Sequence, residues 1–397
     1  MIDRRGMIAL GAGGLAMLAL PGRGRAAAGA PGRGPIVSRI VLEDGRLWIG
    51  ASIAGSKPYL FVIDTGSGFS FLRPEVAREL KLPVTGGHRV GGLGKKTEID
   101  ASYIAHDVLF GGHLRQLVVA FAGYHFQRGM PADAAGLLAA GLFTTHDSDL
   151  DFEAGEWRYW PDGRPDRDGF VQLDGDVGGP VSASLSSHRL TVRAYLDGLP
   201  YRLMLDTGSP GTVTLFPRVA KRSGLFADGV PFAPLQTAGF GGTAAKLSRS
   251  VRAKTLAFGP VTIDRPIVTV MDPGQHSDLE HDGLIGLPLI ALLTLSIDVR
   301  GRRIWARRNA RPVVRGGYRL AGLWLDRDAS GAARVTVVGV GSPAAAAGVR
   351  VGDVVADPPT FEEAVRRIGG APGRAVTLGL RREGARVDVA YTLRDYL

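Results

Sequence analysis

The feature that most constrains this chain is a short segment that occurs twice, at residues 59–67 and 201–209. Each copy is an apolar run that ends in Asp-Thr-Gly-Ser, beginning at Asp64 and at Asp206. Such a run is typical of a buried strand, and a lone carboxylate at its end is costly unless it is hydrogen-bonded or paired. The repetition indicates that each aspartate is the partner of the other. Two carboxylates in contact cannot both ionise readily, so they would share a proton.

The sequence around the two segments also repeats in the same order, which predicts a duplicated domain. The matched pairs are Pro74 and Pro217, which each open a predicted helix; 91–94 and 239–242, both glycine-rich; 135–139 and 282–286; and 150–152 and 297–299. Because there are only two copies, we expect a two-lobed unit rather than a solenoid.

Composition favours β structure, since the chain has 57 glycines, 24 prolines and short apolar segments separated by turn signals. We expect lobe 1 over residues 36–162 and lobe 2 over residues 178–312. The Asp/Gly-rich stretch 162–179 is interpreted as the linker between them. A third unit is expected over 316–397, with strands and a helix from Thr360 to Ile368.

The N-terminus indicates export. Arg4-Arg5 precede an uncharged run over 6–20 and then a small-residue stretch over 25–30, an order typical of a secretory signal peptide, which we place at 1–28. The arginine pair resembles a twin-arginine signal, which would mean export in the folded state. The general secretion route and an uncleaved anchor are the alternatives. We therefore expect a periplasmic or secreted protein without a membrane span after signal removal.

Charge and residue usage narrow the class of protein further. The net charge of +10 permits contact with anionic surfaces, but no nucleic-acid-binding motif accompanies it, so no nucleic-acid partner is expected. The chain has no cysteine, which excludes disulfides and thiol chemistry. His276, Glu280 and His281 could form a metal site on paper, but a solvated loop is the favoured interpretation. No metal and no cofactor are expected.

The paired Asp-Thr-Gly-Ser motifs, each followed by an apolar-apolar-Gly element, resemble the aspartic proteases of the pepsin and retropepsin type over residues 36–312. The resemblance implies two tandem β-barrel lobes related by a pseudo-two-fold axis. It also implies an aspartic endopeptidase in which Asp64 and Asp206 hold a water between them. One carboxylate would act as general base, and the protonated one would polarise the scissile carbonyl and help protonate the leaving amine. Their apparent pKa values would belong to the pair.

The resemblance assigns supporting roles to the residues after each aspartate. Gly66 and Gly208 would allow close backbone approach and unusual torsions, while their amides donate to the carboxylates. The threonines would join the two loops through their hydroxyls, and the serines would donate to the outer carboxylate oxygens. These residues are Thr65, Ser67, Thr207 and Ser209. The glycine-rich tip formed by Gly91, Gly92, Leu93 and Gly94 is interpreted as a flap that closes over substrate.

The C-terminal unit carries a second resemblance. Residues 341–345, followed by 347–355 with Gly348 and Gly352-Asp-Val-Val, resemble the PDZ domains of bacterial envelope proteases. A PDZ domain binds a peptide by adding it as a strand to a sheet edge. The resemblance implies that Gly322, Leu323 and Trp324 form the peptide-binding loop and strand, beside the helix at 360–368. A purely packing role for the unit is the alternative.

We therefore predict a bacterial secreted aspartic endopeptidase with a C-terminal PDZ domain. It would be a monomer, because both aspartates lie in one chain, and its partners would be polypeptide substrates and a PDZ ligand. The alternative is a non-catalytic peptide-binding or quality-control protein of the cell envelope. Carboxylates of Asp64 and Asp206 within reach of one water would favour the enzyme, whereas a separation beyond roughly 8 Å would favour the binding protein.

Overall fold

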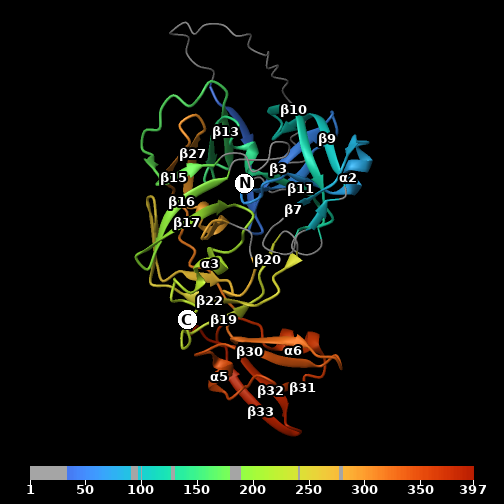
Figure 1. The fold of residues 1–397 in the computed structure, drawn as a ribbon, viewed down its shortest axis with the longest axis vertical. Coiled ribbons are helices and arrows are strands. Elements are labelled where there is room, and N and C mark those ends of the chain that lie inside the picture. The colour runs from blue at the N-terminus through green and yellow to red at the C-terminus, as the bar shows by residue number, and fades with distance from the viewer. Residues whose placement is uncertain are drawn as a thin grey trace.

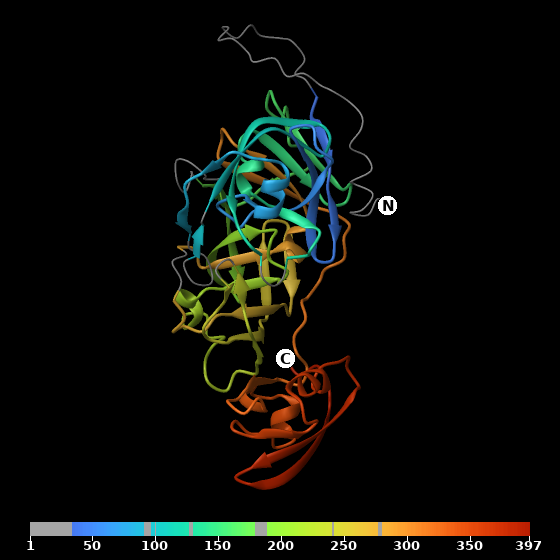
Figure 2. The ribbon, with the colours of Figure 1, turned by 90° about the vertical axis from the view of Figure 1, so that its right-hand side faces the viewer.

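A computed structural model describes residues 34–90, 97–99, 101–126, 130–178, 189–239, 242–276 and 280–397. Two β lobes lie side by side, and a smaller C-terminal domain lies at one end of the molecule (Figures 1 and 2). The predicted signal peptide at 1–28 and the predicted flap tip at Gly91, Gly92, Leu93 and Gly94 lie outside the described residues. The prediction of a mostly β chain is confirmed.

Lobe 1 is a closed β-barrel. Its strands are β2 (Val41–Glu43), β3 (Arg46–Ile53), β4 (Tyr59–Asp64), β5 (Phe71–Leu72), β6 (Val84–Thr85), β9 (Ser102–Phe110), β10 (Leu114–Gly123) and β11 (Ala134–Ala139). Neighbours follow the order β2-β3-β4-β11-β5-β10-β9-β6, and a pairing of β3 with β9 closes the ring. The helix predicted at Pro74 is confirmed as α2 (Pro74–Glu79), and η1 (Ala140–Leu142) follows β11.

The sequence over 88–104 is polar and glycine-rich, which predicts a hairpin, and the structure confirms this hairpin in part. β7 (His88–Val90) and β8 (Thr97–Ile99) pair in antiparallel fashion on either side of the predicted flap tip. Residues from Ser102 onward belong instead to β9, because they continue the barrel wall by pairing with β10. A strand of the barrel therefore begins where the sequence pattern still favoured a polar, glycine-rich hairpin.

Lobe 2 repeats these connections. Its strands are β15 (Gly175–Val177), β16 (Leu190–Leu196), β17 (Leu199–Asp206), β18 (Val213–Leu215), β19 (Ala233–Leu235), β22 (Ser248–Arg252), β23 (Thr255–Phe258), β24 (Val261–Asp264), β25 (Ile267–Val270) and β26 (Gly283–Gly286). Two short helices, α3 (Pro217–Ala220) and α4 (Leu287–Ile290), and the hairpin of β20 (Ala238–Gly239) with β21 (Gly242–Thr243) complete it. The pairing of β16 with β23 corresponds to that of β3 with β9.

A six-stranded sheet joins the lobes, and the repeat pattern alone did not reveal it. Its order is β1 (Ile36–Arg39), β13 (Glu156–Trp160), β12 (Asp147–Asp151), β27 (Leu293–Asp298), β28 (Arg303–Arg308) and β14 (Val171–Gln172). β12 of the first half pairs with β27 of the second, with Leu150 opposite Leu295. The two halves therefore share backbone hydrogen bonds as well as side-chain contacts.

The stretch 162–179, predicted as the linker between the lobes, also forms two short strands, β14 in the shared sheet and β15 in the sheet of lobe 2. Two arginines fix this stretch against the shared sheet: Arg164 Nε lies 3.0 Å from Asp149, and Arg167 Nη2 lies 2.7 Å from Asp147. These side chains are largely buried, so the paired charges satisfy one another away from bulk water.

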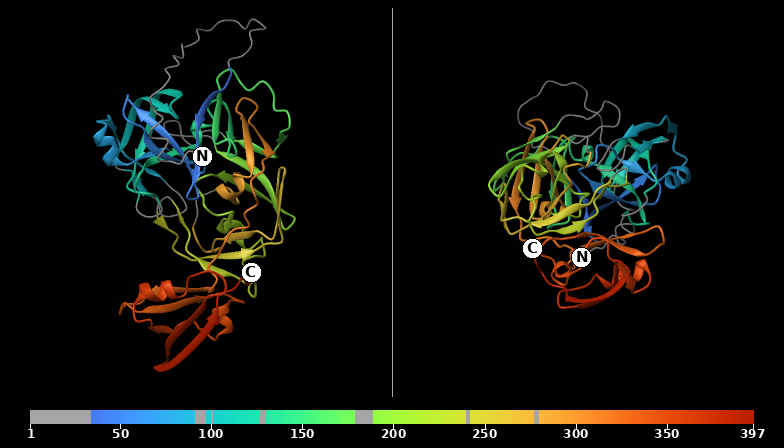
Figure 3. Two further views of the ribbon diagram at one scale, coloured as in Figure 1. Left: turned by 180° about the vertical axis from the view of Figure 1, so that it is seen from behind. Right: turned by 60° about the horizontal axis from the view of Figure 1, so that its bottom comes forward.

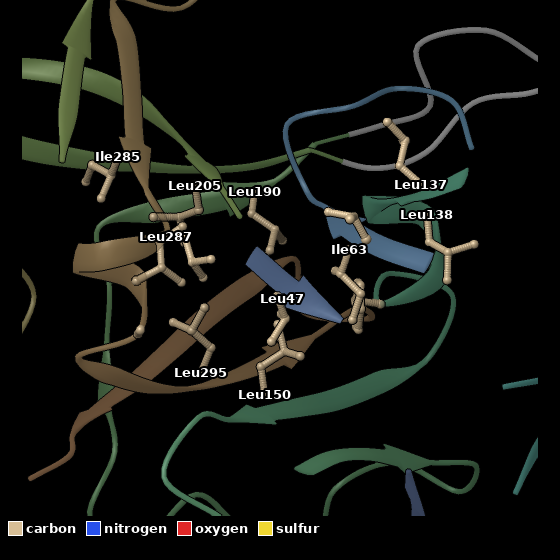
Figure 4. Packing of buried hydrophobic residues seen from close by; sticks show 14 of the residues in the cluster. Leu47, Ile63, Leu137, Leu138, Leu150, Leu190, Leu205, Ile285, Leu287 and Leu295 are labelled. Atoms are coloured by element: carbon tan, nitrogen blue, oxygen red, sulfur yellow. The ribbon is translucent and has the colours of Figure 1, made fainter. Parts of the chain in front are cut away.

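One apolar core runs through both lobes. Figure 4 shows Leu47 and Ile63 of lobe 1 close to Leu190 and Leu205 of lobe 2. Each of these residues lies at a strand end that faces the other lobe. Because these side chains are buried at the boundary between the lobes, β4 and β17 end at this boundary. The candidate site is built on those two strand ends.

The C-terminal domain has its own core. Its sheet has the order β29 (Leu323–Arg327), β30 (Ala333–Val338), β31 (Val354–Asp357), β32 (Ala375–Arg382) and β33 (Ala385–Thr392). The helix predicted from Thr360 to Ile368 is confirmed as α6 (Phe361–Arg367), with Thr360 as its N-cap, and α5 (Pro343–Ala346) is capped by Ser342.

The end of the chain ties this domain to lobe 2. Tyr396 donates its hydroxyl to the carbonyl of Phe232 at 2.9 Å, and Arg252 contacts both carboxylate oxygens of Asp395 at 3.1 Å. Figure 3 shows the domain at the same end of the molecule from behind. Among the described residues, none of the helices has the length and apolar character needed to cross a bilayer.

Candidate active site

Both motif aspartates lie at equivalent strand ends. Asp64 is the last residue of β4 and pairs with Ala139 of the parallel strand β11. Asp206 is the last residue of β17 and pairs with Gly286 of the parallel strand β26. The buried apolar residues before each aspartate hold the strand in the core, so each carboxylate emerges where the two lobes meet.

The threonines of the two motifs bind each other's loops. Thr65 donates its hydroxyl to the carbonyl of Leu205 at 2.7 Å, and Thr207 donates to the carbonyl of Ile63 at 2.8 Å. Each hydroxyl also accepts the backbone N–H of the opposite threonine at 3.0 Å. Both side chains are 1 % exposed, so these bonds form away from water. The two loops are thereby held in fixed register.

The glycines leave room for the opposite carboxylate. A Cβ at Gly66 would lie 2.4 Å from Cγ of Asp206, and a Cβ at Gly208 would lie 2.4 Å from Cγ of Asp64. Any side chain at either position would displace a carboxyl group. The predicted close approach is thus present, whereas the unusual torsions are not, because neither glycine is among the residues with positive φ. Space, not backbone conformation, requires glycine here.

Backbone amides point at both carboxylates. Gly66 and Ser67 each donate an N–H to Oδ1 of Asp64 at 3.0 Å, and Gly208 donates to Oδ1 of Asp206 at 2.9 Å. The hydroxyl of Ser67 donates to the carbonyl of Phe69 at 2.7 Å. The backbone N–H of Ser67 therefore binds the Asp64 carboxylate, and its hydroxyl also bridges to the backbone of the same loop. Ser209 likewise contacts the Asp206 carboxyl through its backbone N–H.

The two carboxyl groups hydrogen-bond to each other. Burial raises the pKa of Asp206 well above its usual range, and the charge of Asp64 and the hydrogen bond to it add to the rise. Burial also raises the pKa of Asp64, but the hydrogen bond from Asp206 and the amides of Gly66 and Ser67 oppose it. The pKa of Asp206 is thus the more strongly raised of the two, and the two carboxyls titrate as a coupled pair.

A positive charge beside the pair was missed by the sequence analysis. Arg189 immediately precedes β16, and its charge lowers the pKa of Asp64. Continuing the β16–β17 register, in which Thr191 lies opposite Met204, puts Arg189 opposite Asp206. The sequence contains a signal that could have identified Arg189: an Arg-Leu pair lies at the start of the segment before each motif, at Arg46 and at Arg189.

The other predicted residues lie elsewhere. Gly322 has a left-handed φ of +67°, and a Cβ there would lie 2.2 Å from Cβ of Ser342. Leu323 is buried at the start of β29, and the indole of Trp324 donates to Asp326 at 3.0 Å. In the part of the chain that the structure describes, no group of three or more His, Asp or Glu side chains is arranged to hold a metal ion.

The sequence is similar to the aspartyl protease family. The model for this family, described as Aspartyl protease, matches residues 49–139 and again residues 192–289. The first matched segment contains Asp64 and the second contains Asp206. The double match supports an aspartyl protease. No curated protein sequence matches the chain.

The comparison with solved structures found, among others, an aspartic proteinase from Irpex lacteus, at 13 % identity and a TM-score of 0.44, covering 71 % of this chain and 100 % of that one. Basic 7S globulin from soybean has 11 % identity and a TM-score of 0.42, covering 69 % and 95 %. Conglutin gamma from lupine seeds has 9 % identity and a TM-score of 0.42, covering 70 % and 95 %.

Proposed function

We propose that this protein is an aspartic endopeptidase that hydrolyses peptide bonds through Asp64 and Asp206. The observation that carries the proposal is the placement of the two carboxyl groups at equivalent strand ends of one chain, each against the glycine that follows the other aspartate. Two carboxyls in this relation share one proton, which supplies a base and an acid side by side. A monomer suffices, because one chain supplies both groups.

The unequal pKa values assign the roles. Asp64, ionised, takes a proton from a water as its oxygen attacks the scissile carbonyl carbon, and Asp206 gives its proton to the carbonyl oxygen. The resulting tetrahedral intermediate collapses when the C–N bond breaks and the proton held by Asp64 passes to the leaving nitrogen, while a hydroxyl of the intermediate returns a proton to Asp206, which restores the starting state of the pair. The amides of Gly66 and Ser67 hold Asp64 in place during both proton transfers.

A pseudo-two-fold axis between the lobes fits this arrangement. The reciprocal bonds of Thr65 and Thr207 and the reciprocal contacts of Gly66 and Gly208 support such an axis. The hairpin of β7 and β8 supports a flap whose tip is Gly91, Gly92, Leu93 and Gly94, since a lid over the dyad would exclude bulk water.

The C-terminal domain is proposed to be a PDZ domain. β29 is the edge strand of its sheet, and an extended peptide could add to that edge beside α6. Arg327 of β29 forms an ion pair with Glu362 of α6 and lies over the ring of Phe361 at 4.6 Å, so the two elements are held together at the far end of β29. Gly322, Leu323 and Trp324 would bind the end of that peptide.

Export to the periplasm or the outside of the cell is part of the proposal. It is supported by the basic, apolar and small-residue order of residues 1–28, and Arg4-Arg5 make the twin-arginine route an alternative to the general secretion route. Fusion of residues 1–35 to a reporter that is active only after export tests this. Loss of export when both arginines become lysine would support the twin-arginine route.

The function is tested with purified protein and an unfolded protein substrate at acidic pH. We expect cleavage that a statine-type transition-state mimic blocks and that the Asp64→Asn, Asp206→Asn double variant lacks. Undiminished cleavage by the double variant would overturn the proposal. Absence of cleavage together with peptide binding would favour the alternative of a non-catalytic binding or quality-control protein.

A further inference from the structure

Arg189 is a partly buried arginine whose charge acts on the dyad, and among the described residues it forms no ion pair. Its Nε is buried and has no hydrogen-bond partner among the described residues. The structure also places no described carboxylate within 4.0 Å of its nitrogens, although the charges of Asp206, Asp64 and Glu280 all act on it. Burying a guanidinium without direct partners is costly. The site therefore contains a hydrogen-bond donor that has no protein partner among the described residues.

The position of Arg189 connects it to both lobes. Its backbone belongs to lobe 2, where its carbonyl accepts the N–H of Gly178 at 2.7 Å and its residue position lies opposite Asp206. Its Nη2 would lie 3.6 Å from a Cβ at Gly68, which is in the loop after Asp64 of lobe 1. The guanidinium therefore spans the boundary at which a substrate would contact both aspartates.

The corresponding arginine of lobe 1 is Arg46. Continuing the β3–β4 register, in which Trp48 lies opposite Val62, puts Arg46 opposite Asp64. Arg46 donates from Nη1 to the carbonyl of Asp44 at 3.1 Å, at the turn before its own strand. The two lobes thus differ at this position, and the cation beside the dyad lies on the Asp206 side.

If Arg189 served only to neutralise the dyad, direct contact with a carboxylate would give the strongest interaction. The guanidinium instead forms no ion pair with either aspartate, and its Nε has no hydrogen-bond partner among the described residues. A carboxylate is the group that a guanidinium fork binds best. We infer that Arg189 selects substrates with an Asp or Glu side chain in the subsite on the Asp206 side of the scissile bond.

This inference rests on the proposed peptidase function and names its substrate class. The acidic side chain would lie between the guanidinium and the cleft, where the Gly68 loop leaves it space. An arginine that binds a carboxylate in this way makes charge-assisted hydrogen bonds, and one such bond is worth about tenfold or more in affinity. A glutamine side chain, equal in size but neutral, would lose that gain.

The test uses one peptide that the full-length protein cleaves, with each position from three before to three after the scissile bond changed to Gln or to Glu. At pH 5.5, where a glutamate is ionised, we expect kcat/KM to favour Glu over Gln about tenfold or more at one position. Arg189→Met should reduce that ratio to about one. Arg189→Lys, which keeps the charge but not the fork, should give an intermediate ratio.

The matched control is Arg193→Met, which removes an exposed arginine of the same strand whose partner is Asp174 at 3.2 Å. It should leave the ratio unchanged.

A ratio near one in the wild-type protein at every position, or a preference that survives Arg189→Met, would overturn the inference and leave the proposed function intact. Failure of the wild-type protein to cleave any peptide would overturn the proposed function and the inference with it. If Arg189→Met does not fold, the Arg189→Lys ratio decides.

Discussion

Gly66 lies directly against the carboxyl group of Asp206, so that a Cβ in its place would come within 2.4 Å of Cγ. The opposite carboxylate thus occupies the space that a side chain would need. Gly66→Ala should destabilise the fold by about 1–3 kcal/mol, as overpacking of a filled site does, and abolish cleavage by displacing Asp206. Chemical denaturation and kcat/KM measure the two effects.

The control for this substitution is Gly317→Ala, since a Cβ at Gly317 meets nothing within 4 Å. It should leave both the free energy of unfolding and the activity as they are. An active Gly66→Ala variant of wild-type stability would show that the carboxyl groups do not lie as close as the structure places them.

The threonine pair predicts a strong coupling between the lobes. Thr65→Val leaves the amide of Thr207 and the carbonyl of Leu205 without their partner, and each buried unsatisfied group costs about 1–3 kcal/mol. Thr207→Val should have the same effect on the other loop. A double-mutant cycle in urea should show that the two losses are not additive.

Thr65→Ser keeps the hydroxyl and is the matched control, so its cost should be smaller than that of Thr65→Val. Additive losses in the valine cycle would mean that the two threonines act independently, contrary to the reciprocal bonds.

The charge of Arg189 predicts the direction of a change in the pH profile. Activity requires one proton on the pair, and the acid limb follows the pKa of Asp64, which the charge of Arg189 lowers. Removing that charge in Arg189→Met raises this pKa, so the acid limb should move to higher pH. The measurement is kcat/KM against pH with a neutral peptide, and Arg193→Met should not move it. An acid limb that stays in place would show that Arg189 does not act on the dyad.

The raised pKa of Asp206 predicts a pH-dependent stability. In the folded protein this carboxyl keeps its proton at pH values where the unfolded chain, with a pKa of about 3.9, has lost it. The stabilisation that this carboxyl contributes is therefore present at low pH and decreases as the pH rises above about 3.9. Asp206→Asn removes the titrating carboxyl and with it this fall in stability. The Tm of the variant should therefore exceed the Tm of the wild type by a larger margin at pH 7 than at pH 4.

Asp264→Asn, which changes an exposed aspartate of β24, controls for the lost charge and should show no such trend. A Tm difference that is constant with pH would mean that Asp206 titrates in the ordinary range.

The attachment of the C-terminal domain depends on Arg252, whose side chain is 13 % exposed and paired with Asp395. Arg252→Ala should free the end of the chain and expose the connecting segment, where Val313 and Val314 are already exposed. Limited proteolysis should then cut this segment faster than in the wild type. Arg386→Ala, whose partner Asp388 lies in the same hairpin, should behave as the wild type. Equal cutting of both variants would show that Arg252 does not hold the domain.

Much of the fold follows from local sequence patterns. The apolar runs that end at Asp64 and Asp206, the proline that opens α2 and the Thr360 cap of α6 are set by neighbouring residues, and the sequence is sufficient to predict them. The repeated motif also makes the partner of each aspartate predictable, because the buried carboxylate needs one.

Other features depend on contacts between distant segments, for which a single sequence has no local signal. The pairing of β12 with β27, which joins the lobes, follows from the packing of two halves whose strands look alike. The linker stretch 162–179 becomes strand only because β28 and β16 offer it free edges. Arg189 was missed because its role depends on strand register, which brings a residue before β16 opposite Asp206.

The central claim is that Asp64 and Asp206 form one catalytic unit with unequal protonation. The most direct measurement is kcat/KM for one cleaved peptide across pH with the wild type, Asp64→Asn and Asp206→Asn. The account predicts a bell-shaped profile for the wild type and loss of cleavage to background in each single variant, because one lacks the base and the other lacks the acid. Cleavage at the wild-type rate by either single variant would contradict it.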